Sequence, residues 1–142
     1  MPREQFKDHV IVCGYGIVGE RIVEILQQSR IRCVVIEQDA KKVEILEERG
    51  LDYIAGDATS SKALKEAGIA NARAIAIVMD DDAKNLFTVI TAKSLNPKIT
   101  IATRANNDFL KSKLEGAGAS FIATPNLSAS TELFNEIAKD TS

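Results

Sequence analysis

The 142-residue sequence has no tryptophan, a single histidine and only two cysteines. One imidazole cannot form a metal site that needs several histidine ligands, so we expect His9 to open the first strand and do no chemistry. Cys13 and Cys33 each lie in an apolar run, and two cysteines provide no disulfide framework. We interpret both as reduced, buried, small hydrophobic side chains rather than as a disulfide or a reactive thiol.

The chain also has no excess of one charge and no long apolar segment. Its formal net charge is -2, so no basic excess indicates a nucleic acid or an anionic membrane as partner. The longest apolar runs, such as Ala74–Met79, are the size of a strand and cannot insert into a bilayer. The first eight residues contain no apolar stretch of the signal-peptide kind, which predicts a cytoplasmic location.

Short β-branched runs alternate with longer amphipathic segments. The runs are nearly continuous in Val, Ile and Ala, as in parallel strands that are covered on both faces. The predicted strands are His9–Cys13, Arg32–Glu37, Asp52–Ala55, Ala74–Met79, Ile99–Thr103 and Ser120–Ile122. The predicted helices between them are Ile17–Gln28, with Val18, Ile22, Ile25 and Leu26 on one face, then Lys41–Arg49, Ser61–Ala67, Asp82–Leu95 and Asp108–Glu115.

Strict alternation through six units predicts an α/β fold: a Rossmann-like, doubly wound, parallel six-stranded sheet with helices on both faces. The length suits a single domain, residues 1–142, with a core over about 9–126 and a C-terminal helix over about 127–139. Gly50, Gly68 and Gly116 each follow a helical segment, where we expect a left-handed C-cap.

The segment from His9 to Gly19 carries a G-x-G-x-x-G motif in the required context. The motif follows an apolar strand and opens an amphipathic helix. Gly14 allows the tight turn out of the strand, Gly16 lets the backbone approach a pyrophosphate, and Gly19 lets the helix pack closely on the sheet. The helix N-terminus then offers unpaired N–H groups to the phosphates. The alternative is a glycine-rich turn that binds no ligand.

An acid ends the second predicted strand, eighteen residues after Gly19. Glu37 would accept hydrogen bonds from ribose hydroxyls and repel a 2′-phosphate, which favours NAD or a plain adenosine nucleotide over NADP. Gln38, directly after it, is a further candidate contact. Asp39 is close enough to compete with Glu37, but we interpret it as the N-cap of the following helix.

Other candidate contacts follow the later strands, because open α/β sheets bind ligands at the carboxyl ends of their strands. Asp57 and Ala58 would flank an adenine, or else Asp57, Thr59 or Ser60 caps the next helix. The guanidinium of Arg104 would reach phosphate oxygens, or else it forms a surface salt bridge.

Three consecutive carboxylates, Asp80–Asp82, follow the fourth strand. They could bind a divalent cation through oxygen ligands, but we favour a helix N-terminal cap.

These motifs together resemble the RCK family (regulator of K⁺ conductance, also called KTN or the TrkA N-terminal domain). The matching segments are HVIVCGYGIVG, VVIE, YIAGDATS followed by L-x-x-A-G-I, ARAIAIVMDDDAKNL, ITIATRANN and L-x-x-x-GA-x-x-x-I-x-TP. They cover His9 to about Asn126, and many members carry a further C-terminal lobe. The chain is therefore either a stand-alone module or a piece of a longer polypeptide.

The resemblance implies a non-enzymatic regulatory domain, at the inner face of the membrane, of a potassium channel or of a Trk/Ktr-type uptake system. It implies that NAD or NADH, or else ADP, ATP or AMP, changes the conformation of a homo-oligomer (a dimer or a larger ring) that is coupled to a membrane subunit. By motif position, Gly14, Tyr15, Gly16, Ile17 and Val18 would line the phosphates. Glu37 would hold the ribose, Asp57 and Ala58 would flank the base, and Arg104 would meet the phosphates. The family's dimer contacts often involve the helices here carrying Leu86, Phe87 and Phe109, and the last helix.

Two alternatives share this fingerprint. One is the cofactor domain of an NAD-dependent dehydrogenase, since a fold does not fix a function. Two observations argue against it: the sequence leaves no room for a substrate domain, and no histidine or tyrosine–lysine pair is poised beside a nicotinamide. The other is the regulatory domain of a Kef-type potassium/proton antiporter, which would also need a glutathione site.

Overall fold

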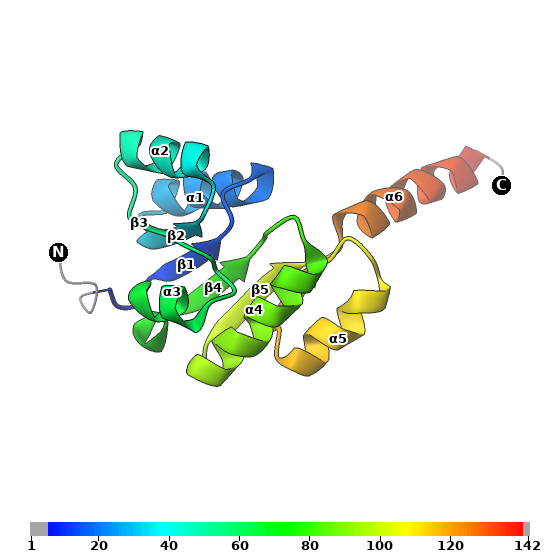
Figure 1. Cartoon of the computed structure of the whole chain (residues 1–142). Coiled ribbons are helices and arrows are strands. Elements are labelled where there is room, and N and C mark those ends of the chain that lie inside the picture. Colours follow the sequence, from blue (N-terminus) through cyan, green and yellow to red (C-terminus); the bar gives the residue numbers. More distant parts are fainter. Residues whose placement is uncertain (1–5, 141–142) are drawn as a thin grey trace.

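The protein forms one parallel sheet flanked by helices (Figure 1). The computed structural model describes the backbone of residues 6–140 and the side chains of 6–124 and 129–139. The strands are β1 (Val10–Cys13), β2 (Cys33–Glu37), β3 (Tyr53–Ala55), β4 (Ala74–Ile77), β5 (Thr100–Arg104) and β6 (Phe121–Ala123). The helices are α1 (Ile17–Gln28), α2 (Ala40–Glu48), α3 (Ser61–Glu66), the 3₁₀ turn η2 (Ile69–Asn71), α4 (Asp82–Leu95), α5 (Phe109–Ala117) and α6 (Pro125–Asp140).

The strand order is β3-β2-β1-β4-β5-β6, and every neighbouring pair is parallel. Val10 of β1 lies opposite Cys33 of β2 on one side and Ala74 of β4 on the other, so β1 and β4 form the centre of the sheet. The direction of winding reverses between them, which creates a crevice at their carboxyl ends. The predicted fold class is confirmed, and each predicted strand lies within two residues of the observed one.

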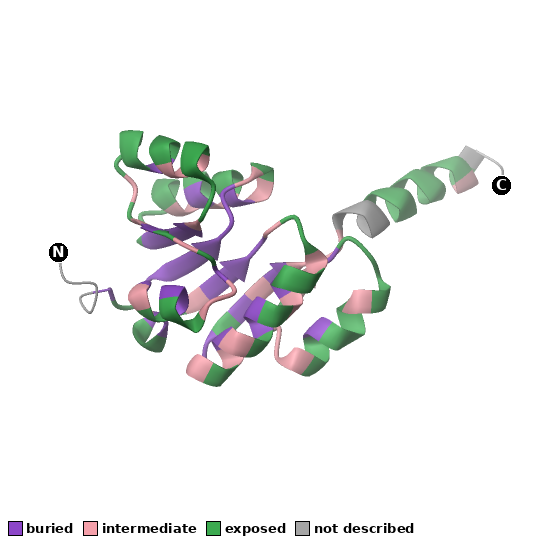
Figure 2. Ribbon diagram, in the orientation of Figure 1, coloured by how far each residue is buried: buried purple, intermediate pink, exposed green. Residues whose placement is uncertain are grey.

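The sheet separates two apolar cores. Val23 of α1 and Leu46 of α2 pack on one face, whereas Leu64 of α3, Val89 of α4 and Leu114 of α5 pack on the other. β1 is buried along its whole length, β2 and β4 are buried except for one half-buried residue each, and the outward sides of the helices are exposed (Figure 2). This burial on both faces explains why the strand sequences are continuous in Val, Ile and Ala rather than alternating.

The last helix, α6, extends away from the body formed by the other elements (Figure 1). It follows β6 after a single residue, Thr124. No helix within the described part of the chain is both long and apolar enough to cross a membrane.

Two details of the helices differ from the sequence predictions. Gly116 lies inside α5, and the left-handed C-cap is Gly118, with φ of +113°, because the helix continues one residue beyond Gly116 before it ends. Ile25 of α1 is exposed, whereas Val23 faces the core in its place. Gly50 and Gly68 have the expected positive φ, and the short 3₁₀ turn after Gly68 was not predicted.

The two cysteines and the histidine are buried. Cys13 and Cys33 are free and belong to different cores, on opposite faces of the sheet. Burial raises the pKa of both thiols, which keeps them protonated. His9 is fully buried just before β1, where its Nε2 lies 2.7 Å from the Ala67 carbonyl oxygen.

Candidate ligand-binding site

A hollow of about 180 Å³ opens at the carboxyl ends of β1 to β4. Its walls come from four chain turns, each of which leaves a strand at this edge of the sheet. The lining residues include Gly14, Tyr15, Gly16, Ile36, Glu37, Gln38, Lys42, Asp57, Ala58, Met79, Asp80 and Lys84. The structure thus brings together, in one hollow, side chains and backbone that the sequence separates by up to seventy residues.

The turn between β1 and α1 is shaped by three glycines with different surroundings. Gly14 has φ of +102°, and a Cβ there would lie 3.1 Å from Met79 Cγ. At Gly19 a Cβ would fall on the Gly14 carbonyl oxygen, so the helix can approach the strand only without a side chain. Gly16, the N-cap of α1, differs: a Cβ there would face open space, with only Lys42 Nζ, 4.0 Å away.

The first backbone N–H groups of α1 lie at this open corner, because the first turn of a helix has no internal acceptors for them. Ile17 is largely exposed and Val18 is partly buried against the core. The Tyr15 side chain points away from the hollow into the core under α1 and α2, where its hydroxyl accepts a hydrogen bond of 2.7 Å from Arg49 Nη1. Tyr15 therefore contributes backbone, not its ring, to the turn.

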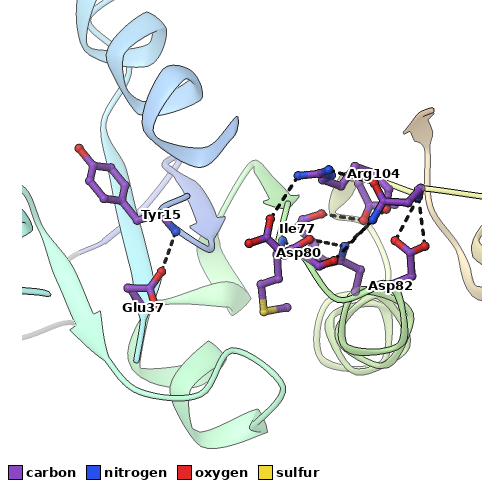
Figure 3. Close-up of polar contacts among 10 residues, drawn as sticks. Tyr15, Glu37, Ile77, Asp80, Asp82 and Arg104 are labelled. Atoms are coloured by element: carbon purple, nitrogen blue, oxygen red, sulfur yellow. Dashed lines mark hydrogen bonds and ion pairs between the residues drawn. The ribbon is translucent and has the colours of Figure 1, made fainter. Parts of the chain in front are cut away.

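The carboxylate of Glu37 is held by three backbone amides. Its Oε1 accepts from Tyr15 N at 2.8 Å (Figure 3), and its Oε2 accepts from Gln38 N at 3.0 Å and Asp39 N at 2.9 Å. These charge-assisted bonds fix one rotamer and tie the end of β2 to the glycine-rich turn of β1. Asp39 in turn caps α2 by accepting from Lys42 N at 3.1 Å, as predicted.

Asp57 and Ala58 lie after β3 at the far end of the same hollow. Asp57 Oδ1 accepts from both Thr59 Oγ1 and Thr59 N, and these bonds lower the pKa of the carboxyl group. The N-cap of α3 is Ser60, whose hydroxyl accepts from Ala63 N. Asp57 thus shapes the turn without capping the helix, and Ala58 is buried.

A second hollow, of about 580 Å³, adjoins the first at Gly16. It is lined by Tyr15, Gly16, Ile17, Val18, Glu20, Lys42, Ile45, Asp80 and Arg104. The Arg104 side chain is only 17% exposed and its Nη1 lies 3.6 Å from the Asp80 carboxylate (Figure 3). Its Nη2 donates to Asn106 Oδ1 at 3.0 Å, and within the described residues its buried Nε finds no acceptor. Arg104 therefore forms an ion pair and also borders the corner at Gly16.

The three consecutive acids after β4 have separate roles. Asp80 faces Arg104, Asp81 caps α4 by accepting from Lys84 N at 3.0 Å, and Asp82 accepts from Asn106 N at 3.1 Å. The predicted cap is confirmed at Asp81. The carboxylates are thereby directed to different partners rather than to one point, and among the described residues no three metal-binding side chains converge.

The sequence interpretation missed Lys42, Met79 and Lys84, which also line the first hollow. Both lysines lie in the first turn of a helix, at the end that faces the crevice. A lysine there has the appearance of a solvated surface residue, and only its position one turn after a crevice-facing N-cap could have indicated it. The buried Asn85 was also missed: it binds Met79 N and O at 3.0 and 2.9 Å and so holds the wall formed after β4.

The strand order, the glycine-rich turn at the switch point and the acid at the end of β2 define a Rossmann-type α/β protein. Within that class, the chain belongs to the TrkA-N domain family, whose sequence profile matches residues 10–125. The resemblance proposed from the motifs is thereby confirmed.

Relatives and solved structures agree with this assignment. Potassium channel protein 1 of Methanocaldococcus jannaschii is 36% identical over 132 residues, which cover 92% of this chain and 40% of the channel protein. The TrkA-N domain of the inner membrane protein ybaL from Escherichia coli has a TM-score of 0.87 at 26% identity, with 92% of this chain and 97% of that domain covered. The chain spans less than half the length of the curated relatives it matches first.

The GsuK channel bound to NAD and GsuK bound to ADP share the fold. Each has a TM-score of 0.77, at 22% and 21% identity, and the match covers 84% and 85% of this chain and 22% and 32% of the respective channel chains.

Proposed function

We propose that the chain is a regulatory domain that binds an adenine nucleotide, NAD or NADH first, with ADP, ATP and AMP as further candidates. The observation that carries the proposal is the open corner at Gly16. It lies beside the first amides of α1 and directly after Tyr15, whose backbone amide is bonded to the Glu37 carboxylate. Amides at a helix N-terminus favour phosphate, and a fixed carboxylate accepts from ribose hydroxyls. Solved structures of the same fold are described as bound to NAD and to ADP.

In this proposal the parts of the ligand lie along the crevice in sequence. The base would lie between Asp57 and Ala58, the ribose at Glu37 and Gln38, and the diphosphate at Gly14, Gly16 and the first turn of α1. Arg104 would reach the phosphates from β5 by exchanging its ion pair with Asp80 for a ligand oxygen. The negative Glu37 carboxylate would repel a 2′-phosphate, so NADP should bind more weakly than NAD.

The test is the substitution Gly16→Leu. A leucine side chain would fill the corner that a phosphate needs, while the nearest atom, Lys42 Nζ, is the end of a flexible chain and can move away. We expect calorimetry to show NAD and ADP binding to the wild type and a loss of at least about tenfold in affinity in the variant, a difference of about 1.4 kcal/mol.

The matched control is Gly116→Leu in α5, where the added side chain also meets open space but lies outside both hollows. Circular dichroism should show both variants folded. Unchanged affinity in Gly16→Leu would place the phosphates elsewhere, and absence of any nucleotide binding to the wild type would refute the proposed function.

We propose that the domain does no chemistry of its own, in contrast to a dehydrogenase cofactor domain. Its only histidine is buried at the end of β1 opposite the glycine-rich turn. The Tyr15 hydroxyl is bonded to Arg49 beneath the helices, and Tyr53 lies in the edge strand β3. Of these three residues Tyr15 alone lines the second hollow, and its hydroxyl is bonded to Arg49. Mixing the protein with NADH and candidate carbonyl substrates should leave the NADH absorbance unchanged.

At the level of the whole protein we propose a role in potassium transport, with this domain, residues 1–142, as one unit at the cytoplasmic face of the membrane. The support is that relatives at 36% and 33% identity are described as potassium channels. The partner would be a channel or transporter membrane subunit, and the domain would act in a homo-oligomer. A regulatory domain of a Kef-type antiporter is the second candidate, favoured by relatives such as a glutathione-regulated potassium-efflux protein at 30% identity.

A further inference from the structure

Three cationic side chains line the two hollows, and they differ in what surrounds them. Arg104 is tied to Asp80 and Asn106. Lys84 lies near the Asp57 carboxylate and helps to lower its pKa. Lys42 has neither kind of neighbour: no acidic side chain in the described chain lies within ion-pairing distance of its Nζ. Among the described residues, Lys42 is therefore the one cation of these three without an acidic side chain beside it.

The position of Lys42 is set by the same bonds that fix the predicted ribose acceptor. Glu37 Oε2 accepts from Asp39 N, and Asp39 Oδ2 accepts from Lys42 N, so two short bonds connect the carboxylate to the first turn of α2. Lys42 is only partly exposed, whereas its neighbour Lys41 is exposed. An ammonium group that borders a hollow and has no carboxylate beside it can form a charge-assisted hydrogen bond with an anionic ligand.

Lys42 also lies where the two hollows meet. It lines both, as do Tyr15, Gly16 and Asp80, and its Nζ lies next to the vacant side of Gly16. The first hollow contains Glu37 and Asp57, and the second begins beyond Gly16. A diphosphate that runs from Glu37 past Gly16 would cross this junction and enter the second hollow.

We propose that Lys42 is a specificity-determining residue that binds the diphosphate group and makes the site prefer ADP and dinucleotides over AMP. The inference rests on the proposed nucleotide function and adds to it the class of ligand that the site selects. The amides at the start of α1 can bind any phosphate. An ammonium group at the junction would stabilise the second phosphate more than the first. The phosphate-to-ammonium contact would form beside the vacant side of Gly16, and added salt would screen it.

The experiment compares Lys42→Gln with Lys41→Gln, which removes the same charge one residue away on the same helix. ADP, AMP, NAD and NADP are titrated into the wild type and both variants by calorimetry at two salt concentrations. We expect Lys42→Gln to bind ADP and NAD about tenfold more weakly, and AMP no more than about threefold more weakly, with a smaller salt dependence for ADP. Lys41→Gln should match the wild type.

Each contrary outcome is distinct. If the wild type binds no adenine nucleotide, the proposed function fails and this inference with it. If the wild type binds and Lys42→Gln behaves like Lys41→Gln, only the inference about Lys42 fails. It is also overturned if AMP weakens as much as ADP, or if NADP alone weakens, because Lys42 would then serve a different phosphate. Thermal unfolding should be alike in all three proteins, since the backbone bond from Lys42 to Asp39 survives the substitution.

Discussion

Three glycines in one turn serve three separate needs at the scale of the single residue. Gly14 adopts a left-handed backbone, Gly19 permits contact between helix and strand, and Gly16 leaves space that the protein does not fill. Only at the first two would an added side chain conflict with the backbone. A substitution at Gly14 or Gly19 should therefore destabilise the fold, whereas one at Gly16 should only fill the open corner.

The substitution Gly19→Ala should destabilise the fold. Its methyl group would overlap the Gly14 carbonyl oxygen, a backbone atom that cannot rotate away, so α1 would have to move from the sheet. We expect a loss of about 3 kcal/mol or more in the free energy of unfolding, measured by urea denaturation. Gly116→Ala is the control: it lies in open space within α5 and should raise stability by about 0.5–1 kcal/mol. Equal effects at both positions would contradict this account.

His9 gives the stability a dependence on pH. Burial lowers its pKa from 6.5, an effect that the bond to the Ala67 carbonyl and the charge of Asp8 oppose and that of Arg32 reinforces. The folded protein therefore favours the neutral ring. This contribution is fully present above the unfolded pKa of 6.5 and is lost as the pH falls below it.

We accordingly expect the free energy of unfolding to fall between about pH 7 and pH 5, and to fall less in His9→Gln. Glutamine has no titrating group in this range and keeps an N–H donor for Ala67. Urea denaturation at several pH values provides the measurement. Parallel pH profiles for the two proteins would show that His9 does not titrate in this way.

At the scale of the element, helix ends around the crevice depend on single caps. Asp81 accepts from Lys84 N at the start of α4, whereas Asp108 at the start of α5 has no side-chain cap bond. We expect Asp81→Ala to lower the free energy of unfolding by about 1 kcal/mol. Asp108→Ala, which removes the same carboxylate without a cap bond, should change it by less than about 0.5 kcal/mol. Chemical denaturation of both variants tests the difference, and similar losses would argue against the cap.

The strands were predictable because their burial on both faces produces continuous Val and Ile runs. The glycine-rich turn was predictable because Gly14 needs a left-handed backbone and Gly19 lets the helix approach the strand. The end of α5 was not, because Gly116 and Gly118 are two residues apart and either could end the helix. The ion pair of Asp80 with Arg104 depends on β4 and β5 being neighbours, which local sequence does not show.

The candidate site also contains residues that the sequence could predict and residues that it could not. Glu37 could be found by its distance from Gly19, since β2 must run beside β1. Lys42 could not, because its place at the junction of two hollows depends on how α2 crosses the sheet.

At the scale of the whole molecule, α6 carries apolar side chains that no other element among the described residues covers. Leu133, Phe134 and Ile137 are each more than 60% exposed, and their spacing of three and four residues places them on one side of the helix. This side is where we expect the proposed homo-oligomer to make contact.

Replacing Leu133 and Phe134 together with serine should weaken self-association by at least about tenfold, since each buried side chain contributes about 1.5–3 kcal/mol. Sedimentation velocity over a range of concentrations measures the effect, and Glu132→Ser on the same helix is the control. The folding of the body should not change, because α6 extends away from it. If the double variant sediments like the wild type, the contact lies elsewhere.

The extended position of α6 and the register of β5 with β6 together suggest how a movement at the second hollow would reach the end of the chain. Arg104, which borders the second hollow, lies opposite Ala123 of β6, two residues before the helix begins. Sixteen residues of helix form a rigid arm about 24 Å long, so every degree of tilt at its base displaces its far end by about 0.4 Å. A ligand that displaced Arg104 would act near the base of this helix. A rotation of α6 too small to disturb the sheet would then produce a larger displacement at the far end of the helix.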